Sequence, residues 1–219
     1  MRIRLRYKVF GLRLPLAIFL ISVITIVGVG YATIYSTLKD NLSEDGESII
    51  VKTEGFQFKF PRNWYAYPIW ENESICAINL VSAESDSILG IIYYKRQEYV
   101  RTLLKEHNLT DDLSIVLFEI NRFYNYLREK SENTTLYIIR NGTISVSGYN
   151  AAYAIFFIEN AFESRGTYYN LTGIFISLTV NENLFEAVFY TWKDQTWNER
   201  YDMFKTVLLS SLVIKHGNE

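Results

Sequence analysis

The distribution of apolar residues divides the chain into one long uncharged run and a later part with short periodic patterns. The run, LPLAIFLISVITIVGVGYATIY at residues 14–35, contains no charged residue. About 20 apolar residues are enough for a helix to cross the hydrocarbon core of a bilayer. In lipid, a helix also satisfies the backbone hydrogen bonds of the whole segment internally. The pattern therefore predicts a transmembrane helix over residues 14–36.

The charges on either side of this run indicate its orientation. Five basic residues lie in the basic segment 1–13, whereas four acidic residues lie at positions 40–47. The positive-inside rule then places the N-terminus in the cytoplasm and residues 37–219 outside the cell membrane. The alternative is a cleaved signal peptide, with Gly30 and Ala32 as small residues near a cleavage site, but the run is longer than a usual signal core. We favour a retained single-pass anchor, and either alternative exports the rest of the chain.

The exported part begins with a polar segment and then changes to strand-like alternation. Residues 37–52, TLKDNLSEDGESIIVK, are polar and acidic, which predicts a linker before an extracytoplasmic domain over residues 53–219. In GFQFKF three phenylalanines alternate with other residues, so they share one face of a half-buried strand. Pro61 has no N–H to donate to a sheet and marks the end of that strand. The three aromatic residues are Phe56, Phe58 and Phe60.

A helical region follows two further strand patterns, CAINLVSA and SILGIIYYK. A short helix is predicted over residues 97–107 and a longer one over residues 110–130, where apolar residues recur at helical spacing. Thr110 or Asp111 can serve as the N-cap of the longer helix. We interpret the adjacent acids Asp111 and Asp112 as residues that suit the positive end of the helix, in preference to catalytic or metal-binding groups.

After residue 134 the pattern returns to strands. TLYIIR and TISVS are separated by Asn141-Gly142, a dipeptide that strongly favours a two-residue hairpin turn. Longer strand patterns follow, joined by short loops, and they predict an antiparallel meander. A closing helix is expected to begin at Thr196, which has the spacing of a capping box with Glu199. The apolar stripe of this helix, expected to pack on the sheet, consists of Trp197, Tyr201, Phe204, Leu208 and Leu212.

N-x-S/T sequons give an independent indication of export. None of them precedes the predicted membrane span. A glycan on such an asparagine needs a surface position in an exported protein. We therefore expect several of these asparagines to be glycosylated and exposed. The candidates are Asn41, Asn72, Asn108, Asn133, Asn141 and Asn170.

Composition excludes some classes of site. After residues 1–13 the chain carries 17 of its 22 basic residues against all 24 acidic ones, and an acidic domain of this kind is a poor partner for nucleic acid. Cys76 is the single cysteine, so no intramolecular disulfide is possible. Its apolar flanks predict a small buried side chain. Few Gln, Met and Cys beside many Ile, Tyr and Glu residues are typical of a thermophile.

Several motifs resemble a known family. GFQFKFPRNW is similar to the opening G-F-x-F-x-x-P-x-x-W of the PsbP/Mog1-like superfamily, which includes PsbP-related proteins of archaea and bacteria. VSGYNAAYAIFF resembles its hairpin segment, and the stretch from LFEAVFYTW to SSLVI resembles its closing strand, helix and tail. These motifs span residues 54–214. The resemblance implies an α+β fold, an α/β sandwich with a central antiparallel sheet flanked by helices, and a non-catalytic accessory or assembly role. No metal- or ion-binding residue of that superfamily has a match here.

Catalytic chemistry has little support in the sequence. No spacing fixes a pair of carboxylates, and neither G-x-S-x-G nor H-E-x-x-H occurs. We therefore expect no catalytic, cofactor or metal site. An extracytoplasmic hydrolase stays an alternative, since a pair of acids can form in three dimensions from distant residues. The carboxylates considered for it are Glu71, Glu73, Asp111, Asp112, Glu159 and Glu163.

The favoured function is a binding or assembly module, an accessory subunit with a protein partner in a membrane or envelope complex. Exposed aromatics would supply its contacts, although partly buried structural aromatics are the alternative. A spacer glycoprotein is a further possibility. A pocket lined by paired acids would favour the enzyme. A broad apolar face without glycans would favour the binding module, and glycans on all sides would favour the spacer. The contact candidates are Tyr65, Tyr67, Trp70 and Trp192.

Overall fold

The computed structural model describes residues 42–45, 48–67, 70–131, 133–193 and 196–215. None of the helices in these ranges has both the length and the apolar character needed to cross a membrane. The predicted membrane span over residues 14–36, the basic segment before it and Asn41 lie outside the described residues.

The fold is mixed α+β, with two sheets in which every strand pairing is antiparallel. The smaller sheet consists, in spatial order, of β1 (Leu42–Asp45), β2 (Ser48–Lys52), β3 (Phe56–Pro61) and β12 (Val213–Ile214). In the eight-stranded sheet β5 (Trp70–Glu71) pairs with β6, and the other strands follow the order β4 (Trp64–Ala66), β6 (Ile75–Ser82), β7 (Ser87–Tyr94), β11 (Asn183–Thr191), β10 (Thr167–Val180), β9 (Tyr149–Ser164) and β8 (Thr135–Val146).

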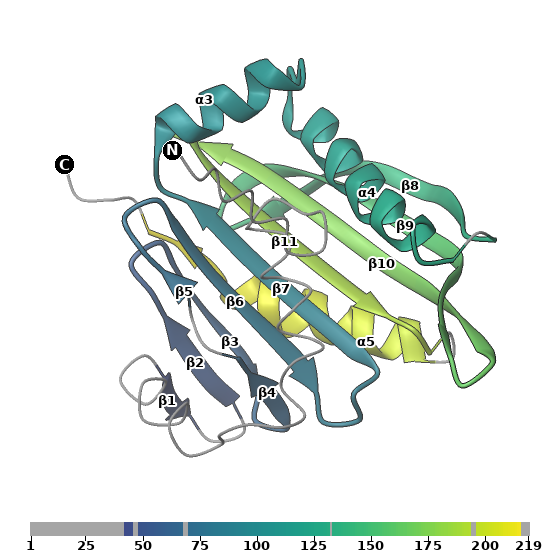
Figure 1. The fold of residues 1–219 in the computed structure, drawn as a ribbon. Coiled ribbons are helices and arrows are strands. Elements are labelled where there is room, and N and C mark those ends of the chain that lie inside the picture. Colours follow the sequence, from purple (N-terminus) through teal and green to yellow (C-terminus); the bar gives the residue numbers. More distant parts are fainter. Residues whose placement is uncertain (1–41, 46–47, 68–69, 132, 194–195, 216–219) are drawn as a thin grey trace, which may run out of the picture.

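Helices and the smaller sheet cover both faces of the large sheet (Figure 1). Helix α4 (Asp112–Arg128) packs on one face, and α5 (Trp197–Met203) packs on the other face beside the smaller sheet. A π-helical segment, Phe204–Leu209, continues α5. The short helix α3 (Gln97–Glu106) closes one end, where Val100 is buried. The resulting arrangement has three layers.

Strand β11 shows why both faces of the large sheet must be apolar. Phe185 and Phe189 point toward the smaller sheet and α5, whereas Val188 and Tyr190 point toward α4. Because side chains alternate between the faces of a strand, β11 can contribute to both cores at once. The Phe189 ring stacks on the Phe204 ring at a centroid distance of 5.2 Å, which fixes α5 and its continuation to the sheet.

The predicted phenylalanine face of β3 is confirmed. Phe56, Phe58 and Phe60 are buried, and adjacent rings of the three lie 5.9 and 6.1 Å apart. Phe56 also makes an edge contact with Phe185 at 6.3 Å, which joins the smaller sheet to the large one. The segment expected to be a linker, residues 37–52, behaves differently in its described part. It forms β1 and β2, because β2 pairs with β3 and buries Val51 in the same core.

Of the two predicted helix N-caps, the one of α4 is confirmed and the capping box of α5 is wrong. Asp111 caps α4, since its Oδ1 accepts a hydrogen bond of 2.7 Å from the Ser114 backbone N–H and Ser114 Oγ accepts one from the Asp111 N–H. Thr196 precedes α5 as expected but forms no capping box. Its φ and ψ of −97° and −6° turn the hydroxyl back, so that it donates to the Lys193 carbonyl at 2.9 Å.

The stripe of the closing helix packs as predicted. Trp197, Tyr201, Phe204 and Leu212 all belong to the core between the sheets and α5. The side chain of Leu208 is outside the described part of the chain.

The hairpin predicted at Asn141-Gly142 is wrong. Strand β8 continues through this dipeptide, with Asn141 opposite Ala154 and Gly142 opposite Tyr153. The turn lies at Ser147-Gly148, where both residues have positive φ, 53° and 84°, as this type of turn requires. A turn at Asn141 would have left the buried part of β9 without a neighbour on this side, so the longer ladder prevails. Strands β8, β9, β10 and β11 then form the expected meander.

We predict that Phe58→Ala lowers the free energy of unfolding by about 3–5 kcal/mol, because it deletes a fully buried ring from a packed core. Urea unfolding of the full-length protein in detergent, followed by tryptophan fluorescence, measures this change. Tyr168→Ala is the control, since half of that side chain is exposed. Equal midpoints for Phe58→Ala and the parent protein would contradict the placement of β3.

Candidate functional site

The aromatic contact candidates lie in different environments. Tyr65 is 51% exposed, whereas Tyr67 and Trp192 are partly buried against the core beneath α4. The indole of Trp192 meets the ring of Phe162 edge-on at 6.1 Å. The Trp70 side chain is not among those described. Of the three candidates whose side chains are described, Tyr65 is the exposed one, and Tyr67 and Trp192 have the positions of structural aromatics.

The described sequon asparagines are mostly at the surface. Asn72, Asn108, Asn133 and Asn141 are exposed, and Asn170 is half-buried. Asn170 Oδ1 accepts a hydrogen bond of 3.1 Å from the Asn160 backbone N–H, so its side chain already has a structural role.

The carboxylates considered for catalysis do not converge. Glu71 pairs with Lys95 at 2.9 Å, and Glu73 pairs with Arg96. Asp111 is the cap of α4, and Asp112 accepts a hydrogen bond of 2.6 Å from the Thr179 hydroxyl. The remaining two, Glu159 and Glu163, are exposed on β9.

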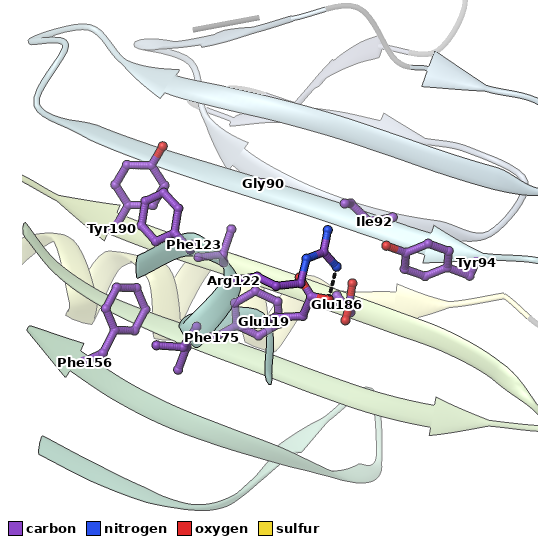
Figure 2. Close-up of a pocket in the computed structure, with 12 residues that line it drawn as sticks. Gly90, Ile92, Tyr94, Glu119, Arg122, Phe123, Phe156, Phe175, Glu186 and Tyr190 are labelled. Carbon is purple, nitrogen blue, oxygen red and sulfur yellow. Dashed lines mark hydrogen bonds and ion pairs between the residues drawn. The ribbon is translucent and has the colours of Figure 1, made fainter. Parts of the chain in front are cut away.

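A different pair of carboxyl groups meets in a cavity of about 40 Å³ between α4 and the large sheet (Figure 2). Glu119 comes from α4, and its side chain is 7% exposed. Glu186 comes from β11, and the whole residue is 4% exposed. Arg122, one turn after Glu119 on α4, pairs with Glu119. The remainder of the lining is mainly apolar and aromatic, with Ile92, Tyr94, Ile120, Phe123, Phe156, Phe175, Val188 and Tyr190.

Two buried polar atoms, one in this cavity and one beside it, lack a hydrogen-bond partner among the described residues. Oε1 of Glu186 belongs to a residue that lines the cavity, whereas Oγ of Ser177 belongs to a neighbouring residue that does not line it. Ser177 on β10 lies directly opposite Glu186 in the strand register, so both side chains point to the α4 face. Buried polar atoms in native proteins usually have a partner, so each orphan needs an explanation.

Burial raises the pKa of Glu186 well above its ordinary value, and the charge of Glu119 raises it further. The guanidinium of Arg122 and hydrogen bonding by Tyr94 act in the opposite direction. Burial also raises the pKa of Glu119, against the effect of Arg122. Two carboxyls that share one guanidinium in a low dielectric cannot both ionise without cost, so the site tends to hold a proton.

The sequence contained weak signals for this pair. Glu119 and Arg122 have the i,i+3 spacing of an ordinary surface ion pair on a helix. Glu186 occupies the same strand face as Val188 and Tyr190, so it is a charged residue in an apolar alternation. That interruption was the available clue, but only the fold brings β11 and α4 together.

The free edge of the large sheet is the second feature of interest. No described strand pairs with the outer side of β8. Tyr137 and Ile139 on this strand are 49% and 60% exposed, and Ile138 between them is also exposed. The register with β9 shifts between Ile138 and Arg140, so Ile139 is the extra residue of a β-bulge.

Cys76 is buried, as its flanking residues predicted. Burial raises the pKa of its thiol to about 12, so the thiol stays protonated and unreactive at neutral pH. Among the described residues, no cluster of three or more His, Cys, Asp or Glu side chains has the arrangement of a metal site.

Comparisons with known proteins show likeness only to solved structures. No family model matches the chain, and no curated protein does. The solution structure of cyanobacterial PsbP (CyanoP) from Synechocystis sp. PCC 6803 is similar with a TM-score of 0.49 and 14% identity, over 87% of this chain and 99% of that one. LpqN of Mycobacterium tuberculosis, a protein involved in cell envelope biogenesis, is similar with a TM-score of 0.39 and 11% identity, over 86% of this chain and 100% of that one. A Bacteroides thetaiotaomicron protein is similar with a TM-score of 0.43 and 13% identity, over 80% of this chain and 51% of that one.

The raised pKa of Glu186 predicts that stability falls as pH rises. In the unfolded chain this carboxyl ionises near its ordinary pKa of 4.5, whereas the folded protein keeps the proton to higher pH. The native state binds more protons between these two values, so the free energy of unfolding decreases with pH there. Glu186→Gln should remove most of this slope and be more stable than the parent at alkaline pH.

Urea unfolding from about pH 4 to about pH 9 measures the slope. Glu163→Gln is the control, because it removes an exposed carboxyl from β9. Identical slopes for the parent, Glu186→Gln and Glu163→Gln would show that Glu186 does not carry the proton.

Proposed function

We propose that this chain is a non-catalytic accessory subunit that binds an extended segment of a partner protein along the free edge of β8. It would be held at the outer face of the cell membrane by the helix predicted over residues 14–36, with a PsbP-like domain as the binding module. The observation that supports binding is the row of exposed apolar residues on an edge strand of 12 residues, Thr135–Val146.

An edge strand has unpaired backbone donors and acceptors along one side, which makes it a template for another strand. Proteins usually keep such edges short, charged, covered or interrupted by a β-bulge, and β8 has one such bulge, at Ile139. Strand β8 is long and has a single charged residue, Arg140, which is exposed. In strand addition the main chain supplies affinity and alternate side chains supply specificity. Tyr137 and Ile139 would then be the specificity contacts.

The charge of Arg140 favours a different protein over a second copy of this chain. If two β8 strands paired antiparallel about their centre, the two Arg140 side chains would become close neighbours and repel. A partner strand with an acidic residue opposite Arg140 would avoid this repulsion. Complementary charge across an interface also suppresses wrong partners.

One observation favours the spacer as a second candidate. Two of the exposed sequon asparagines, Asn133 and Asn141, lie just before β8 and within it. A glycan on Asn141 would stand on the edge strand and prevent another strand from pairing there. Occupancy of Asn141 therefore distinguishes the binding module from the spacer.

The cavity between α4 and the sheet fits a hydrolase of envelope polymers poorly. A volume of about 40 Å³ has room for roughly three or four water-sized groups, since about 10–15 Å³ is needed for each. Paired acids would favour an enzyme if a sugar ring or peptide could reach them. Both carboxyls here lie beneath α4.

We expect Arg140→Glu to reduce recovery of the partner by about tenfold or more, because it reverses the charge that the partner strand faces. A photoreactive residue at position 139 of the full-length protein in native membranes would form the cross-link, and quantitative mass spectrometry would measure it. Arg165→Glu is the matched control, since Arg165 is exposed in the β9–β10 hairpin.

The cross-linked product decides among the possible occupants of the edge. One stoichiometric partner, lost in Arg140→Glu and kept in Arg165→Glu, supports the proposal. A product formed by two copies of this chain, or by its own residues before 42, would replace the proposed partner. Complete glycosylation of Asn141 without any cross-link would favour the spacer.

A further inference from the structure

We propose that the cavity beneath α4 binds a small organic cation, a primary ammonium group with a short apolar substituent, between Glu119 and Glu186. This site is distinct from the β8 edge and does not depend on the function proposed for that edge. It rests on three features of the cavity: its charge, its orphaned polar atoms and its walls.

When Glu186 is ionised, the charged groups of the cavity leave one negative charge without a partner of its own. Glu119 and Glu186 contribute two carboxylates when ionised, and Arg122 is the single cation that lines the cavity. Arg122 pairs with Glu119, while Oε1 of Glu186 has no partner among the described residues. A second cation placed at Glu186 would complete a pair for each carboxylate. Buried charges are usually paired in this way, because an isolated one is costly.

The orphaned atoms match the donors of an ammonium group. A primary ammonium has three N–H donors and no acceptor. Oε1 of Glu186 and Oγ of Ser177 are both acceptors without a partner, and the strand register places their residues directly opposite each other on the α4 face. One ammonium could donate to both of them. A neutral water molecule could also fill this position, with Glu186 keeping its proton, whereas an ammonium group would pair with the ionised Glu186.

The walls select an apolar substituent. Phe123, Phe156, Phe175 and Tyr190 line the cavity, and Figure 2 shows Phe156 and Tyr190 on the side away from Glu186. Aromatic faces attract cations and pack against short alkyl groups. Gly90 on β7 also lines the cavity and, having no side chain, occupies little of it. The volume of about 40 Å³ limits the ligand to an ammonium with a short chain.

Arg122 is the more exposed residue of the ion pair that lines the cavity. Its side chain is 31% exposed while that of Glu119 is 7% exposed, so the guanidinium lies at the outer side of the pair. Entry of a cation at Glu186 requires loss of the proton that burial and Glu119 favour there. Tyr94 from β7 and Tyr190 from β11 are the other titratable groups that line the cavity. The affinity for the cation should therefore rise with pH.

Thermal unfolding of the full-length protein with ethylammonium chloride tests the proposal, with sodium chloride at matched ionic strength as reference. Ligands that bind only the native state raise the midpoint with concentration. We expect a saturable rise with ethylammonium that grows with pH, and no comparable rise with ethanol, which has a similar size but no charge. Tetramethylammonium, which lacks N–H donors and is bulkier, should also fail.

Variants assign the effect to the cavity. Glu186→Gln should lower the affinity for ethylammonium by about tenfold or more, whereas the exposed Glu163→Gln should leave it unchanged. Because Glu186→Gln is expected to fold well, a lost shift there reports on binding. Ser177→Ala should weaken binding less, since it removes a neutral acceptor.

Three results would overturn the proposal. An equal rise with ethanol would make the cavity a site for neutral molecules or water. A rise that persists in Glu186→Gln would place the binding elsewhere, and no rise with ethylammonium at any pH would mean that the cation does not bind. The partner cross-link at β8 is measured separately, so failure of either proposal can be recognised without the other.

Discussion

The fold depends on covering both faces of one wide sheet. Seven strands side by side, from β4 to β8, extend over roughly 30 Å at a spacing of about 4.8 Å. A single helix is roughly 10–12 Å across, side chains included, so it covers only two or three strands. On one face the smaller sheet and α5 together cover the large sheet, and the smaller sheet does so through contacts such as that between Phe56 and Phe185. On the other face α4 is the long covering helix.

The need to cover both faces of the large sheet also explains which parts of the fold can be predicted from the sequence. The phenylalanines of β3 and the stripe from Trp197 to Leu212 are local periodic patterns. The three phenylalanines are buried, and the described stripe residues pack against the same core as their period predicts. The cap of α4 at Asp111 is also local, because it involves only residues within one turn. Where the outcome depends on a distant neighbour, local signals fail. Asn141-Gly142 favours a turn, but β8 continues through it because it pairs with β9 there.

The described part of the expected linker shows the same limit. The segment SIIVK is short and lies among acids, so its composition suggests irregular structure. Its role as β2 follows from β3, which supplies the ladder and the core that receives Val51. The acid pair is further from prediction. Glu119 and Glu186 are 67 positions apart in a chain with 24 acidic residues. The clue at Glu186, a charged residue in an apolar alternation, does not identify Glu119 as its neighbour before β11 is placed beneath α4.

Both sites proposed for function lie where the cover of the large sheet is incomplete. Helix α4 packs mainly over β9 and β10, so toward β7 its cover ends above Gly90 and Ile92, and the cavity forms there. Filling this gap with a large apolar side chain would have been the simpler solution for stability, because replacing buried ionic groups by apolar ones is often neutral or stabilising. In the opposite direction the cover ends before the outer side of β8, where Tyr137 and Ile139 stay exposed. A charged gap and an apolar edge are both costly for a domain that only has to fold, and that cost is the physical reason to look for ligands at these two places.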